Sequence, residues 1–204
     1  MPFTPTASPA AIGLRAHSGW AMLVAVTGSL SAPAILQRRR LQLAPSQTSS
    51  PFQPYHAARA MPLDQARVFL AQCAATAQSL ALDAIQTTLD DLTRRHHHVT
   101  AACILLGSGR TTTGLAAILA SHPAVHTAEG EFFRQALRSA CQSCGLAVSG
   151  IKERELLALA AARFPLPPPE IERRISALGK LTGPPWTQDE KLCALAAFLL
   201  LAPQ

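Results

Sequence analysis

The chain has 204 residues, a formal net charge of +6, and a composition that is 49% hydrophobic but only 5% aromatic. This length supports one domain with a substantial core, or at most two small ones. The longest wholly apolar run, residues 192–202, is too short to span a bilayer, so we expect no membrane role. Alanine and leucine supply much of the apolar content, which favours helices around a modest sheet.

Basic residues are concentrated near the amino terminus. Residues 1–63 contain five arginines and no acidic residue, whereas residues 64–204 contain the other thirteen basic residues and all twelve acidic ones. The amino-terminal third can therefore contact phosphates or other anionic surfaces. A solvated strand face is the commoner explanation for such a charge pattern.

The five cysteines are an odd number, and four of them lie in apolar surroundings. This pattern predicts free, buried thiols in a reducing cytoplasm. Cys141 and Cys144 form a lone C-x-x-C pair at a helix end, without the second pair or suitably spaced histidines that zinc requires. Export is the alternative to the cytoplasm, because the apolar run 20–26 after Arg15 resembles a short signal-peptide core.

Residues 11–43 consist of three apolar runs separated by short stretches rich in turn-forming residues. This pattern predicts an antiparallel meander of strands at 11–16, 20–27 and 34–43. The preceding residues 1–10 are rich in proline, threonine and alanine, and we expect them to form a disordered tail. The turn formers of residues 44–61 predict a long loop that is either mobile or functional.

A long helix is predicted from Pro62 onwards, because apolar residues recur at three- and four-residue steps as far as Leu92. The positive residues 94–98 are expected to end this helix, where the helix dipole favours positive charge. Three of them are consecutive histidines, but neighbouring helical positions point in different directions, which argues against a metal site.

A buried central strand is predicted at residues 99–106, followed by a glycine-rich loop at 107–114 and a helix at 115–121. This arrangement can hold a phosphate on backbone N–H groups. Leu115 and Ala116 stand where a P-loop needs lysine and serine or threonine, which excludes that type of nucleotide hydrolysis. The remaining predicted elements are a helix at 128–143, a strand at 146–151, and helices at 154–164, 170–178 and 187–202, the last opened by a capping box from Thr187 to Glu190.

This order of elements, with a glycine break after the first strand, resembles the ribonuclease H-like superfamily. Residues 12–21 resemble its opening strand-turn-strand, and residues 189–197 resemble the acidic start of its final helix, as in Holliday-junction resolvases and related predicted nucleases. The resemblance implies a single α/β domain over residues 11–204. In that domain the three-stranded antiparallel meander is extended by two further strands into a mixed five-stranded sheet flanked by helices.

Nucleases of this superfamily hold two metal ions, Mg or Mn, on carboxylates, and a carboxylate from the first strand bridges both ions. Arg15 stands at that position here, and the central strand 99–106 contains no acidic residue. Our first hypothesis is therefore a module without nuclease activity and without a cofactor, acting in binding or as a scaffold. Its basic edge would contact nucleic acid or an acidic protein partner through Arg15, Arg38, Arg40 and Arg110, with Arg59 as a further contributor.

The alternative is a metal-dependent nuclease or phosphoryl hydrolase with a rearranged carboxylate site. Its catalytic residues would be Glu129, Glu131 and Asp189, and its Mg or Mn ligands would be His126, Glu129 and Asp189. Each of these acids also fits the first turn of a predicted helix, where the dipole favours carboxylates. His122 precedes Pro123 and is expected to be extended, out of alignment with His126.

Two observations would favour the enzyme: convergence of the three carboxylates at the carboxyl ends of the strands, or another acidic side chain in the gap beside Asp189.

Overall fold

The structure is a computed structural model that describes residues 7–45, 53–109 and 114–202. Its strands are β1 (Ser8–His17), β2 (Trp20–Ser29), β3 (Ala32–Gln42), β4 (His97–Leu106) and β5 (Ala147–Lys152). Its helices are α1 (Pro54–Ala58), α2 (Leu63–Arg94), α3 (Leu115–Ala120), α4 (His122–Ser143), α5 (Glu153–Arg163), α6 (Pro168–Ala177), α7 (Gly179–Thr182) and α8 (Gln188–Leu201).

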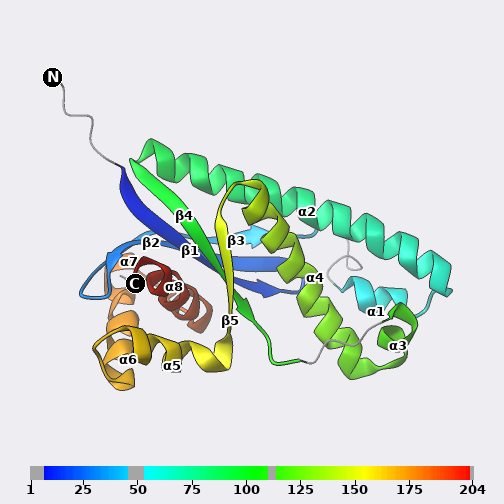
Figure 1. Cartoon of the computed structure of the whole chain (residues 1–204). Helices are drawn as coiled ribbons and strands as arrows, with labels where there is room; N and C mark the ends of the chain where they lie inside the picture. The colour runs from blue at the N-terminus through cyan, green and yellow to red at the C-terminus, as the bar shows by residue number, and fades with distance from the viewer. Residues whose placement is uncertain (1–6, 46–52, 110–113, 203–204) are drawn as a thin grey trace.

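The strands form one mixed five-stranded sheet in the order β3-β2-β1-β4-β5, with helices on both faces (Figure 1). β1, β2 and β3 pair as an antiparallel meander, and Gly19, at a φ of 80°, forms the tight turn between the first two. β4 and β5 run parallel to β1. The predicted fold class is confirmed.

The two faces of the sheet carry separate cores, because alternate residues of each strand point in opposite directions. On one face, Ile12 and Leu14 of β1 pack in a cluster that includes Ile85 of α2 and Phe133 of α4. On the other face, β1 and β2 pack against α8 in a cluster that also includes α5 and α6. The sheet therefore separates α2 and α4 from α8.

Gly13 allows α8 to approach β1 closely. A Cβ atom at this position would lie 1.9 Å from the backbone oxygen of Cys193, which no side chain can tolerate. The close approach holds the start of α8 next to the end of β1, where the candidate site lies.

Several element boundaries differ from the predicted ones. β1 begins at Ser8 rather than residue 11, because residues 8–10 pair with the start of β4. α1 forms within the predicted loop 44–61, of which residues 46–52 lie outside the described part of the chain, as do residues 1–6 of the predicted tail. His97 and His98 belong to β4 rather than to the end of α2.

α4 begins at His122, six residues earlier than predicted. The Ser121 side chain accepts a hydrogen bond from the Ala124 N–H as the helix N-cap, and Pro123 occupies one of the first two helical positions, where proline is tolerated. His122 is therefore helical, so the expectation of an extended residue was wrong.

By length and hydropathy alone, α2 could cross a membrane: an 18-residue window has a mean hydropathy of 1.3 and is 22% buried. Its buried side chains, which include Ala77, Ala81, Ile85 and Leu92, recur at helical spacing and belong to the core on one face of the sheet. This is the pattern of a helix that packs against a sheet.

Candidate functional site at the carboxyl ends of the parallel strands

Arg15, near the end of β1, joins two carboxylates from distant parts of the chain. Its Nε and Nη2 atoms donate to Oε1 and Oε2 of Glu153 at 2.9 and 2.8 Å, which makes a bidentate pair. Its Nη1 donates to Oδ1 of Asp189. The Arg15 side chain is 25% exposed, so this guanidinium is largely shielded from water.

His17, two residues further along β1, extends the same cluster. Its Nε2 lies 2.8 Å from Oδ2 of Asp189, and its ring stacks on Trp20 with the ring centroids 4.1 Å apart. The Arg40 guanidinium lies 4.0 Å from the centre of the Trp20 ring. Because His17 and Arg40 come from the strands on either side of β2, they cover both faces of Trp20. We call Arg15, His17, Glu153 and Asp189 the Arg15 network.

Local structure explains how these residues meet. β1 and β5 both run towards the same edge of the sheet, so Arg15, His17 and Glu153, which directly follows β5, arrive together. Asp189 lies in the first turn of α8, which the predicted capping box opens: the Thr187 N–H donates to Glu190 Oε2 at 2.6 Å. The carboxyl ends of parallel strands are the usual position of ligand sites in α/β proteins.

The electrostatics of the Arg15 network favour the charged guanidinium. The hydrogen bond to Glu153 is the largest cause that raises the pKa of Arg15 above its ordinary value, and the charge of Asp189 adds to it. Each of the four carboxylate oxygens of Glu153 and Asp189 already contacts Arg15 or His17. The two carboxylates therefore hold an internal cation.

Some arginines of the predicted basic edge are hydrogen-bonded within the protein, and others are exposed. Arg38 donates to the Thr182 carbonyl at 3.0 Å, to the Pro185 carbonyl and to Glu190 at 3.3 Å, so it ties β3 to the segment before α8. Arg59 donates to the Leu119 carbonyl at 3.3 Å. Arg40 is exposed, and Arg110 lies outside the described residues.

Two further basic residues lie beside the Arg15 network. Lys152 and Arg154 flank Glu153, with side chains 46% and 65% exposed. Together with residues 106–108 they line a cavity of about 330 Å³ at the carboxyl ends of β4 and β5. Their contacts to Glu155 are 3.4 and 3.6 Å long and exposed, and such pairs hold the side chains weakly.

The carboxylates named for a rearranged site are not brought together. Glu129, on α4, is 3% exposed and accepts a hydrogen bond from the Tyr55 N–H at 3.0 Å. Glu131 pairs with Arg134 at 2.9 Å. Asp189 lies on α8, across the sheet from α4, while His126 lies against His122.

Sequence reasoning missed Glu153 and His56. Glu153 comes two residues after the predicted strand 146–151, so its place near the carboxyl end of a strand was the available signal. His56 lies 3.4 Å from Glu129 and was hidden in a stretch interpreted as a loop.

Comparison with known proteins gives a match in structure but not in sequence. Neither a family model nor a curated protein matches the chain. Thermus thermophilus RuvC in complex with a Holliday junction substrate superposes with a TM-score of 0.52 at 11% identity, covering 93% of this chain and 90% of that one. The fold is ribonuclease H-like. A second structure of RuvC from the same organism matches with a TM-score of 0.52 at 10% identity, over 93% and 92% of the two chains.

The ribonuclease H-like fold implies a pair of metal ions at this edge of the sheet, and the residues present do not fit them. A hard divalent cation is held by oxygen ligands, which include one or two carboxylates that are free to coordinate it. Here a guanidinium lies between the two carboxylates, and a positive charge in that position repels a second cation.

Proposed function

We propose that this chain is a ribonuclease H-like binding module that does not cleave phosphodiesters, and that it contacts nucleic acid through the exposed basic side chains beside the Arg15 network. The observation that carries the proposal is the Arg15 guanidinium, which is bonded to both carboxylates in place of a metal ion. The module acts by binding, without chemistry at this edge.

Exposed charge supports nucleic acid as the partner. Arg40, Lys152 and Arg154 present three cations around the edge of the sheet at which the parallel strands end. Arg15 and Arg38 have internal partners and are left out of the contact surface. The structurally similar RuvC is described in complex with a Holliday junction, which makes branched DNA the first ligand to test.

Binding is tested by fluorescence anisotropy with a labelled four-way junction and a labelled duplex over a range of salt concentrations. Three phosphate contacts predict a slope of log K against log salt of about −3 for duplex DNA. The triple variant Arg40→Ala/Lys152→Ala/Arg154→Ala should lose most of the affinity and flatten the slope.

A matched control removes the same charge elsewhere. Arg67, Arg94 and Arg173 are exposed residues on α2 and α6, and replacing all three with alanine should leave more of the affinity. Equal losses in both triple variants would mean that only net charge matters, and absent binding would remove nucleic acid as the partner.

One observation favours a second candidate, a metal-dependent nuclease: Glu153 lies beside Asp189, so two carboxylates do meet at this edge. That activity requires Arg15 to move away. Incubating the junction and single-stranded DNA with Mg²⁺ or Mn²⁺ separates the candidates. The binding module leaves both substrates intact, whereas cleavage that Asp189→Asn abolishes would establish the nuclease.

A further inference from the structure

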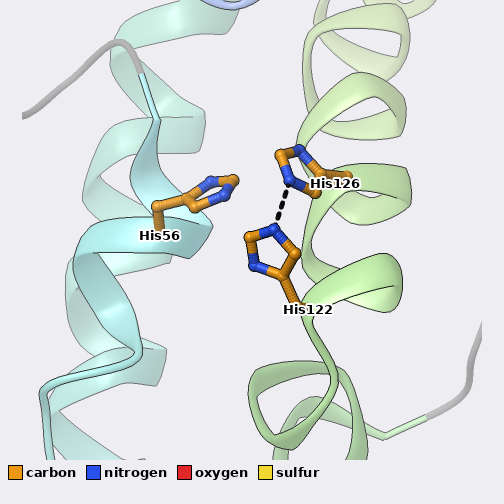
Figure 2. A group of neighbouring side chains, drawn as sticks. All are labelled: His56, His122 and His126. Atoms are coloured by element: carbon orange, nitrogen blue, oxygen red, sulfur yellow. Dashed lines mark hydrogen bonds between the residues drawn. The ribbon is translucent and has the colours of Figure 1, made fainter.

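Three histidines from two helices meet on the side of the sheet away from the Arg15 network. His56 is on α1, and His122 and His126 are one turn apart on α4 (Figure 2). One ring nitrogen from each lies within 4.8 Å of the other two. The Nε2 atoms of His122 and His126 are 2.9 Å apart, and the His56 ring centroid is 4.7 Å from that of His126.

The start of α4 and the packing of α1 on it bring the three histidines together. Because α4 begins at His122, the i,i+4 spacing puts His122 and His126 on one helix face. α1 packs against α4, as well as against α2 and α3, at one end of the molecule (Figure 1), and this contact brings in His56. A nearby cation, Arg59, is held to the Leu119 carbonyl.

A buried carboxylate is a second, independent observation. Oε2 of Glu129 lies 3.4 Å from Nδ1 of His56, and Glu129 is 3% exposed. Its Oε1 is buried and has no hydrogen-bond partner among the residues that the structure describes. Metal-binding histidines usually donate their second ring N–H to a carboxylate, which fixes the tautomer and the ring orientation. With Nδ1 facing Glu129, His56 keeps Nε2 for a ligand.

We propose that His56, His122 and His126 bind a transition-metal ion, Zn²⁺ in preference to Mg²⁺ or Mn²⁺, and that Glu129 is a positioning residue for His56. Three imidazoles suit zinc, whereas hard cations prefer oxygen. Zn–N bonds of about 2.0 Å place tetrahedral ligand atoms roughly 3.3 Å apart, so small ring rotations complete the site. His122 and His126 are exposed, which leaves the fourth position to water.

Zinc bound by these three histidines would link α1 to α4. A ligand that binds only the folded chain stabilises it in proportion to the logarithm of its concentration over Kd. Zinc should therefore raise the melting temperature and protect residues 54–58 from proteolysis, a readout independent of any activity at the Arg15 network.

Zinc binding is measured by calorimetry on the full chain without an affinity tag, with Mg²⁺ and Mn²⁺ as comparison ions. We expect one Zn²⁺ per chain and a loss of affinity of more than tenfold in His126→Ala. The matched control is His98→Ala, an exposed histidine on β4 that should leave binding unchanged. Binding lost in His98→Ala but kept in His126→Ala would overturn the proposal.

Cobalt substitution tests the ligand set and the role of Glu129. Co²⁺ should give the visible bands of a tetrahedral site without the thiolate charge-transfer band that cysteine ligands produce. Glu129→Gln should lower zinc affinity about tenfold and shift the Co²⁺ bands, which a purely structural role would not do. A thiolate band would contradict the three-histidine ligand set. Co²⁺ bands and a zinc affinity that stay unchanged in Glu129→Gln would contradict the positioning role of Glu129.

Discussion

Replacing Arg15 with alanine measures how much the Arg15 network contributes to the free energy of unfolding. The substitution removes two hydrogen bonds to Glu153 and one to Asp189, and leaves two carboxylates beside each other without their cation. A hydrogen bond to a charged group contributes about 1.5–3 kcal/mol. Breaking a fully buried ion pair costs about 3–5 kcal/mol. Because the Arg15 side chain is 25% exposed, we take the lower end and expect a loss of about 3 kcal/mol.

Urea denaturation of the wild type and the variant measures this free energy of unfolding. The triple variant Arg15→Ala/Glu153→Gln/Asp189→Asn should recover at least half of the loss, because it also removes the uncompensated charges. The free energy of unfolding of Arg15→Lys should lie between those of the wild type and Arg15→Ala, since lysine keeps the charge but cannot make the bidentate contact. A loss below about 0.5 kcal/mol in Arg15→Ala would show that the Arg15 network is no stronger than an ordinary exposed ion pair.

Three other variants or conditions test the fold around the site. Gly13→Ala should cost about 3 kcal/mol or more, seen as a large drop in melting temperature, because its Cβ would lie 1.9 Å from the Cys193 carbonyl oxygen; an unchanged melting temperature would contradict the packing of α8 on β1. Arg38→Ala should cost about 2 kcal/mol in urea unfolding but leave the slope of DNA affinity against salt unchanged, since this side chain is bonded within the protein; a flatter slope would return it to the contact surface. Alkaline pH should destabilise the chain, because burial raises the pKa of the Cys141 thiol from 9.0 to about 12. As the pH rises, the thiol ionises first in the unfolded chain, so its contribution to stability is intact below pH 9 and is lost between pH 9 and 12. Cys141→Ala should reduce that loss, and equal pH profiles of the wild type and the variant would contradict the burial of the thiol as its cause.

The meander and the order of elements along the chain could be predicted from the sequence because hydrophobic alternation and glycine turns are local signals, whereas the mixed five-stranded sheet followed from the family resemblance. The runs on either side of Gly19, the buried stretch before Gly107 and the capping box at Thr187 each act over a few residues. Boundaries were predicted less well where long-range pairing decides them: residues 8–10 become strand because β4 lies beside them.

The candidate site was only half predictable for the same reason. Arg15 and Asp189 stood at positions that the family resemblance marks, so they could be named in advance. Glu153 meets them only through the parallel pairing of β4 with β5, which no local pattern encodes. His56 meets His122 and His126 because a short helix forms in a stretch rich in turn-forming residues and because proline opens α4.

We propose that the Arg15 guanidinium takes the place of metal ions at this edge of the sheet. Mn²⁺ titration followed by NMR of the Trp20 indole tests it directly, because Trp20 stacks on His17 and bound Mn²⁺ broadens nearby signals. A His126→Ala background prevents competition from the histidine cluster. We predict that the Trp20 signal stays sharp with Arg15 present and broadens in Arg15→Asp. Broadening with Arg15 present that Asp189→Asn prevents would instead show that a metal ion binds beside the guanidinium.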